Sequence, residues 1–347
     1  MRMNRTEEQI ISHWSQEFDR PMVSVCCLAY NHEHYVAQTL DSILAQVTNF
    51  PIEVLINDDA SQDSTTEIIK RYERLYPKIV KPIYQRENQY SSGILMNPTI
   101  NFPRARGKYI ALCECDDFWT LDSKLQRQYE FMERQTDVSV YFHPVIELNL
   151  ATGTSEIVCN HYSDSQVVSL QDVVSGRGAY MPTPSLFFRA SLLRNKLSWF
   201  ESDWPVGDFF LQVILGFYGS IYYDHRVMAT YRRNAPGSWT SSMQSDTKRL
   251  NYNVRMGGGI LRLFRLLKHA RSRHILAVPY SYYYLGGIDK SQGIFAVFCK
   301  VVFPEMLIST NIRFIILYYK EVTFKASAVL RKKLKTGWRF LITRFSR

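Results

Sequence analysis

The feature that most constrains the fold of this chain is a regular alternation. Short apolar runs alternate with segments that place apolar residues at helical spacing. The run 22–30 (MVSVCCLAY) is apolar and rich in β-formers, as is typical of a strand buried on both faces. Segment 34–47 then repeats apolar residues on one helix face. Further predicted strands cover 52–56, 79–84, 108–113 and 138–142, and further helices 66–76, 97–106 and 121–134. This order predicts an α/β fold with a mostly parallel, Rossmann-like sheet flanked by helices.

The second half of the chain has a weaker pattern. Short strands are predicted at 185–189, 221–224 and 227–232, with an apolar helix at 207–218. Beyond residue 238 the spacing is mainly helical. With 347 residues, more than one structural unit is expected. The predicted boundaries are an N-terminal helical extension over 1–20, an α/β domain over 21–240 and a basic helical region over 241–347.

Three polar loops follow predicted strands, at 31–34, 57–64 and 114–119, and the last two are acidic. Ligands of open α/β sheets bind beyond the carboxyl ends of the strands, so these loops are the candidate site. In the second loop, Asp58 or Asp59 is suited to accept a hydrogen bond from a base or ribose, whereas Asp63 is placed to cap the next helix. An Asp-rich turn after a strand is common, so this loop alone is a weak signal.

The third loop places Glu114, Asp116 and Asp117 directly after an apolar strand. Carboxylates at the end of a buried strand suffer desolvation and mutual repulsion, and a divalent cation relieves both. Oxygen ligands suit Mg²⁺ or Mn²⁺, and such an ion can neutralise a departing diphosphate. The alternative is a solvated acidic turn that caps the following helix.

Several motifs, in order, resemble family 2 glycosyltransferases, which are inverting enzymes with the GT-A fold. The resemblance covers roughly 21–240 and is carried by motifs in both halves of that region. They are SVCCLAYN at 24–31, VLINDDASQDS at 54–64, Asn88, NFPRARGKY at 101–109, ECDDFW at 114–119, WPVGD at 204–208, Tyr231-Arg232, and GSWT at 237–240. ECDDFW resembles the family's metal-binding D-x-D motif in the variant E-x-D-D-x-W.

The resemblance implies transfer of a sugar, with inversion, from a nucleotide-diphosphate donor, expected to be a UDP-sugar. The family's nucleotide-sugar contacts fall on residues of several strand-end loops, namely Ala29, Asn31, Asp58, Asp59, Asn88, Glu114 and Asp116. Asp116 and Asp117 are the expected metal ligands, for Mg²⁺ or Mn²⁺. Asp208 takes the position of the catalytic base.

These roles agree with elementary chemistry. An acceptor hydroxyl is a poor nucleophile, so a carboxylate within hydrogen-bond reach must take its proton as attack develops. Asp208 opens an apolar helix, and the alternative for it is a helix cap. Arg232 is a candidate contact to the leaving diphosphate, and a structural arginine is the competing interpretation. Trp204 is a candidate acceptor contact because aromatic faces stack on sugar rings, with core packing as the alternative.

One position departs from the family pattern, and two histidines of the first loop need an interpretation. Where members often carry Tyr-Arg-x-His, this chain has Asn234, which puts metal binding at that position in doubt. His32 and His34 lie in the first loop, and we interpret both as surface residues rather than ligands.

The net charge of +10 is unevenly distributed. Residues 255–347 hold 18 Lys or Arg against three acidic residues, so the remainder of the chain is slightly acidic. Segments 259–270 and 326–345 mix these basic residues with Leu, Trp and Phe, which favours peripheral contact with an anionic membrane over nucleic acid. The alternative is a solvated basic face. No apolar leader and no uncharged run of spanning length is evident, so the expected location is the cytoplasm, at the inner face of the membrane.

The acceptor implied by the family and by this charge is a glycan or lipid-linked sugar of the kind used in bacterial surface polysaccharides. A different class of function is a catalytically inactive, glycosyltransferase-like binding partner at the membrane. The acidic residues and Asp208 argue against it, and Asn234 argues mildly for it. The six cysteines are interpreted as small buried hydrophobic residues, because a lone C-x-C pair is a weak zinc signal.

Overall fold

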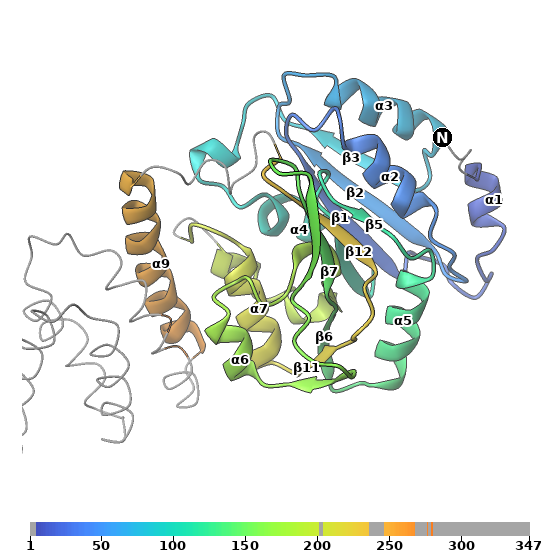
Figure 1. Ribbon diagram of the computed structural model, residues 1–347. Coiled ribbons are helices and arrows are strands. Elements are labelled where there is room, and N and C mark those ends of the chain that lie inside the picture. The colour runs from blue at the N-terminus through green and yellow to red at the C-terminus, as the bar shows by residue number, and fades with distance from the viewer. Residues whose placement is uncertain (1–4, 201–203, 236–245, 268–275, 277–278, 280–347) are drawn as a thin grey trace, which may run out of the picture. The chain divides into compact units, whose positions relative to one another are not determined.

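The structure is a computed structural model that describes residues 5–200, 204–235, 246–267, 276 and 279 (Figure 1). The chain divides into two compact units, Met1–Arg249 and Leu250–Arg347. The motif predicted at 237–240 and the basic segment 326–345 lie outside the described residues.

An eight-stranded sheet with the order β3-β2-β1-β4-β10-β6-β11-β9 forms the centre of the first unit. Four of its seven pairings are parallel, and the other three involve β10 or β9. This confirms the predicted α/β fold with a mostly parallel sheet. The strands are β1 (Val23–Ala29), β2 (Ile52–Asp58), β3 (Val80–Tyr84), β4 (Tyr109–Leu112), β6 (Val138–Phe142), β9 (Gln166–Val168), β10 (Phe187–Arg189) and β11 (Ser220–Tyr223).

A smaller sheet has the order β5-β12-β7-β8. β12 pairs antiparallel with β5, which directly follows the acidic loop, and parallel with β7. β7 and β8 form an antiparallel hairpin. Its strands are β5 (Phe118–Trp119), β7 (Val145–Asn149), β8 (Thr154–Val158) and β12 (Ala229–Arg233). The small sheet therefore carries a late part of the chain back to the acidic loop.

Helices cover both faces of the large sheet. In Figure 1, α2, α3 and α5 lie on one side of it, and α4, α6 and α7 on the other. The α-helices of the first unit are α1 (Glu7–Ile11), α2 (Val36–Leu44), α3 (Thr65–Leu75), α4 (Phe102–Arg104), α5 (Lys124–Arg134), α6 (Leu170–Ser175) and α7 (Asp208–Phe217). Short turns of other helix types are η1 (Tyr90–Ser92), η2 (Asn97–Asn101), η3 (Thr183–Ser185), η4 (Ala190–Leu192) and η5 (Leu197–Phe200).

The main core forms between β1, β2, β4 and the helices on one side of the sheet. Alternate residues of β1, such as Val25 and Cys27, belong to it, and Leu40 and Ile43 of α2 pack there from one helix face. Burying each large aliphatic side chain contributes roughly 1.5–3 kcal/mol. The other residues of β1 are also little exposed, which explains why this strand is apolar throughout. Of the described cysteines, all five are free thiols and four are buried.

The N-terminal segment is tied to the α/β domain. Thr6 and Gln9 form a reciprocal capping box at the start of α1. Glu7 accepts the backbone N–H groups of Lys78 and Ile79 at 2.7 and 3.1 Å. The predicted helical extension therefore includes α1, whose Ile10 joins the main core.

The second unit is described mainly through α9 (Asp246–Leu267), which begins just before the boundary. Met256, Ile260, Leu263 and Leu267 follow one helix face and are at most 3% exposed. Among the described residues, no helix is both long and apolar enough to cross a membrane.

Candidate active site

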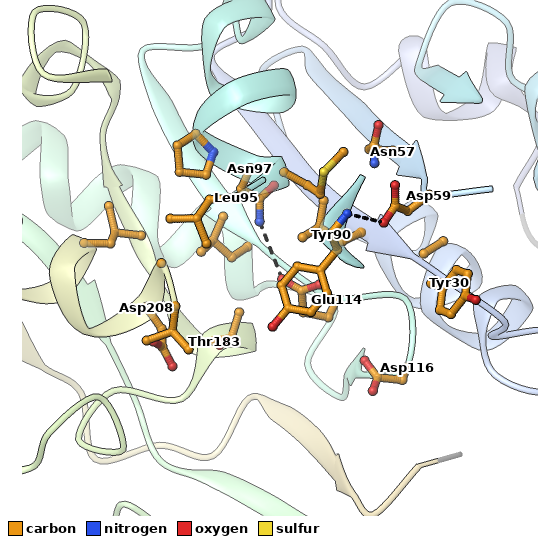
Figure 2. Close-up of a pocket in the computed structure, with 18 of the residues that line it drawn as sticks. Tyr30, Asn57, Asp59, Tyr90, Leu95, Asn97, Glu114, Asp116, Thr183 and Asp208 are labelled. Carbon is orange, nitrogen blue, oxygen red and sulfur yellow. Dashed lines mark hydrogen bonds between the residues drawn. The ribbon is translucent and has the colours of Figure 1, made fainter. Parts of the chain in front are cut away.

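A pocket of about 360 Å³ opens beyond the carboxyl ends of β1, β2 and β4. This is where the strand order reverses, because β2 and β4 lie on opposite sides of β1. Figure 2 shows Glu114 between Asp208 on one side and Asp116 on the other. Seven of the predicted residues line it, namely Ala29, Asp59, Asn88, Glu114, Asp116, Asp117 and Asp208.

Hydrogen bonds from α2 hold the acidic loop in place. Thr39, which has no exposed surface, donates its hydroxyl to the carbonyls of Cys115 and Asp117 at 3.0 and 2.6 Å. The hydroxyl of Ser42 accepts the N–H of Trp119 at 3.0 Å. The loop thus keeps its conformation through hydrogen bonds to a neighbouring helix, as a preorganised site requires.

Arg232, on β12, fastens the same loop from the other side. Its backbone N–H donates to Asp117 Oδ1 at 2.8 Å, and its guanidinium donates to the carbonyl of Asp116 and to the amide oxygen of Gln38. The guanidinium also lies over the rings of Tyr35 and Phe118, at 5.0 and 4.6 Å from their centroids. Arg232 is 6% exposed and is not among the pocket-lining residues, so it positions the loop in this structure and does not face the pocket.

The three carboxyl groups of the loop have different surroundings. Burial raises the pKa of Glu114 to about 8, with further increases from the charges of Asp116 and Asp208. Burial also raises the pKa of Asp117 well above its usual range. Asp117 has no exposed surface, and its Oδ2 has no partner among the described residues. Asp117 is thus buried and bonded to β12 through Oδ1, and its role as a metal ligand stays a prediction.

A divalent cation at this loop would have to be held partly by its substrate. No group of three or more His, Cys, Asp or Glu side chains able to hold an ion occurs among the described residues. Mg²⁺ is commonly bound through one or two carboxylates together with substrate phosphates. Asp116, whose side chain keeps 13% of its surface, is the carboxylate of the loop that the pocket leaves available for this.

The second acidic loop is mainly structural. Asp58 is 1% exposed, and its carboxylate accepts the hydroxyls of Ser61 and Thr66. Asn31 has a left-handed backbone (φ 55°), and its side-chain oxygen accepts the N–H of Gln62 at 2.8 Å. Neither residue is among those that line the pocket, and their contact to a nucleotide stays a prediction.

Asp59 lines the pocket and organises its far wall. Its carboxylate accepts the N–H groups of Gln89 and Tyr90 at 2.8 and 3.0 Å. Asn88 also lines the pocket, and its side-chain oxygen accepts the N–H of Ser91 at 2.7 Å. The segment after β3 is thus held against the end of β2.

Asp208 is the first residue of α7, and its side chain is exposed at the pocket. Its Oδ1 accepts the N–H of Phe209 at 2.7 Å, so it also satisfies the start of its own helix. The surrounding protein raises the pKa of Asp208 by desolvation, against the lowering effect of the backbone N–H groups. Beside it runs the turn at Gly178, which has a φ of 95° and where an added Cβ would lie 3.6 Å from Asp208 Oδ2.

Trp204 corrects a prediction from the sequence. It is 1% exposed, with its ring stacked on Phe210 at 4.1 Å and edge-on to Phe200 at 4.9 Å. Since its faces are covered by core residues, the packing interpretation replaces that of a sugar contact. Phe200, not Trp204, lines the pocket.

The position of His32 also differs from the prediction. We expected a surface residue, but His32 is 9% exposed and lines the pocket, whereas His34 keeps 75% of its side-chain surface. Burial lowers the pKa of His32. Asn234, at the position of the family histidine, donates its side-chain amide to Asn149 at 3.1 Å.

Sequence reasoning missed several lining residues, namely Tyr30, Tyr90, Asn97, Thr183 and Phe200. Tyr30 could have been found, because it lies at the carboxyl end of a predicted strand. Thr183 comes from a turn before the antiparallel β10, and no local pattern connects it with the acidic loop.

Comparison with known proteins identifies the class of protein that this fold and pocket define. The solved structure of TarS residues 1–349 from S. aureus, in complex with UDP-GlcNAc, aligns with a TM-score of 0.58 at 18% identity. The alignment covers 80% of this chain and 76% of that one. At this identity the likeness shows the fold, which is the GT-A fold of glycosyltransferases.

Sequence comparison gives the family. The family model described as glycosyl transferase family 2 matches residues 24–176. The uncharacterised protein Rv1520 of Mycobacterium tuberculosis is 32% identical over 275 residues, which are 78% of this chain and 76% of that protein. The UDP-Glc:alpha-D-GlcNAc-diphosphoundecaprenol beta-1,3-glucosyltransferase WfaP of Escherichia coli is 32% identical over 126 residues, 36% of this chain and 47% of WfaP. The chain belongs to glycosyltransferase family 2 and is a glycosyltransferase.

Proposed function

We propose that the protein transfers a sugar, with inversion, from a UDP-sugar to a hydroxyl of a glycan or lipid-linked acceptor. The observation that carries this proposal is the presence of Asp116 and Asp208 in one pocket at the switch point of the sheet. Support for a uridine nucleotide comes from the UDP-GlcNAc bound to TarS and from the UDP-Glc donor in the name of WfaP. Support for a lipid-linked acceptor comes from the diphosphoundecaprenol acceptor in the name of WfaP.

In the proposed reaction, Asp208 is the general base. It accepts the proton of the acceptor hydroxyl while the oxygen attacks the anomeric carbon and the bond to the nucleoside diphosphate breaks. The carboxylate is exposed at the pocket and stands on a rigid helix, two properties that a base needs. Its raised pKa makes it a better proton acceptor than an ordinary aspartate.

Asp116 would hold a Mg²⁺ or Mn²⁺ ion that binds the diphosphate. Such an ion supplies charge stabilisation for the leaving group. Arg232 and Thr39 would keep the backbone around Asp116 in the conformation that this contact requires. Glu114 and Asp59 remain the candidate polar contacts to the sugar and the nucleoside.

The first experiment is thermal melting with a panel of nucleoside diphosphates, with and without Mn²⁺, on wild type and on Asp116→Asn. A ligand that binds only the folded state increases the free energy of unfolding, by about 2.7 kcal/mol when its concentration is a hundred times its Kd. The melting temperature rises as a result. We expect a metal-dependent rise with UDP that Asp116→Asn abolishes.

Transfer is then tested by release of UDP from UDP-sugars in the presence of glycan and lipid-linked acceptors. A protein that binds UDP with metal but releases none with any acceptor would favour the inactive binding partner. Melting that no nucleotide changes, in a folded protein, would contradict the donor site itself.

We further propose that the basic region 241–347 holds the enzyme at the inner, anionic face of the cell membrane, as a peripheral protein. The support is its charge, 18 basic against three acidic residues over 255–347. Co-sedimentation of the full chain with vesicles should require anionic lipid and weaken as salt increases. Equal binding to neutral vesicles would contradict an electrostatic attachment.

A further inference from the structure

His32 lies beside the carboxylate that is proposed to hold the metal. Its Nε2 is 4.0 Å from Asp116 Oδ2, with both side chains largely buried at the pocket, at 11% and 13% exposure. The two residues come from different strand-end loops, after β1 and after β4. Their approach is therefore a product of the sheet, in which β1 and β4 are neighbours.

The backbone of His32 is fixed on both sides. Its N–H donates to the Thr65 hydroxyl at 2.7 Å, and its carbonyl accepts the N–H groups of Tyr35 and Val36 at 2.9 Å. The loop thus enters α2 in a defined conformation. This is the rigidity that a ligand-binding side chain requires.

The imidazole, in contrast, is not satisfied by the fold. Nδ1 is buried and has no hydrogen-bond partner among the described residues. Nε2 is too far from Asp116 for a direct hydrogen bond at 4.0 Å. Nε2, which is the nitrogen nearest Asp116, is therefore available to a partner that arrives with the ligand.

The separation of the two atoms matches joint coordination of one ion. With metal–ligand distances of about 2.0–2.2 Å, two ligands of an octahedral ion lie roughly 3 Å apart when adjacent and roughly 4 Å apart when opposite. A neutral imidazole is a common metal ligand in proteins, and diphosphate oxygens and water can complete the shell.

We propose that His32 is a protein ligand of the divalent cation, together with Asp116. This rests on the proposed function, since it assumes an ion on the donor diphosphate at Asp116. The proposal adds a residue of the first strand-end loop to the metal site. His32 would thus supply an imidazole in a chain that has Asn234, bonded to Asn149, where family members often carry a histidine.

The test is electron spin-echo spectroscopy of Mn²⁺ bound to the full chain in the presence of UDP. Wild type should show ¹⁴N modulation from a directly bound imidazole, which changes when the protein is made with ¹⁵N-histidine. His32→Gln should lose the modulation and bind Mn²⁺ at least ten times more weakly in calorimetric titration with UDP. His34→Gln, the exposed neighbour, is the matched control and should keep both properties.

The outcomes separate the two proposals. Absence of any Mn²⁺–UDP binding by wild type overturns the proposed function and this inference together. Binding without ¹⁴N modulation overturns only the role of His32, as does modulation that persists in His32→Gln. The wild-type spectrum does not depend on any variant folding, and His32→Asn serves as a second variant if His32→Gln melts early.

Discussion

The two sides of the pocket are built differently. The acidic loop is tied to α2 through Thr39 and to β12 through Arg232. Asp208, on the other side, is exposed, and its carboxylate accepts the backbone N–H of Phe209 in its own helix. The side that would bind a charged diphosphate is thus preorganised, whereas the side that would take a proton keeps its carboxylate accessible. Variants of the two sides should fail in different ways.

The largest effect is expected for Asp208→Asn. Removal of a general base lowers the rate by about 10²–10⁴-fold. UDP binding with Mn²⁺ should be unchanged, and the melting temperature should not fall, because the side-chain oxygen of asparagine can still accept the N–H of Phe209. Single-turnover transfer and melting measure both. A variant that retains more than a tenth of the wild-type rate would remove Asp208 from the chemistry.

Arg232→Lys tests the opposite side. Lysine cannot reproduce two guanidinium bonds and the stacking between Tyr35 and Phe118, so we expect a loss of roughly 2 kcal/mol in unfolding free energy. Affinity for Mn²⁺–UDP should fall as well, and urea unfolding and calorimetry measure the two. Arg233→Lys is the control, because that side chain is 49% exposed and forms a surface ion pair with Glu147. Equal effects of the two substitutions would contradict a special role for Arg232.

The pH dependence of transfer should report on Asp208. Its raised pKa means that it is protonated, and inactive as a base, at a higher pH than an ordinary aspartate, whose pKa is about 3.9. The rate should fall about tenfold for each pH unit below that pKa and be restored above it. UDP binding measured over the same range separates protonation of the base from loss of the donor. A profile that is flat down to pH 4 would mean that Asp208 does not act as the base.

The smallest of the four effects is expected for Thr39→Val, which removes a hydroxyl from under the acidic loop. Two carbonyls would lose a donor, at a cost of about 1 kcal/mol. A modest loss of Mn²⁺–UDP affinity should accompany it, with little change in the rate at saturation. Thr120→Val, at an exposed position in the next segment, is the control. A fall in the saturated rate alone would show that the two sides of the pocket are coupled.

Much of this fold and part of the site could be predicted from local patterns. The apolar run of β1 and the helical spacing of α2 are short-range features, and the polar residues that end β1, β2 and β4 must meet at one edge of a parallel sheet. This pattern predicts Glu114 and Asp116 as candidates, whereas Asp208 was implied by the resemblance to family 2 glycosyltransferases. The antiparallel insertion of β10 between β4 and β6 was not, because nothing in its short sequence distinguishes the two directions.

What the chain's own sequence determined was the list of residues available for chemistry and the order of strands and helices that presents them. What only the tertiary structure decided was how each of them is used. Arg232 meets a carbonyl 116 residues away because β12 pairs beside the acidic loop, and Trp204 is covered because Phe210 stacks on it. His32 approaches Asp116 for a similar reason. Spacing along a chain governs contacts within a few residues, whereas these contacts depend on which surfaces the packed sheet brings together.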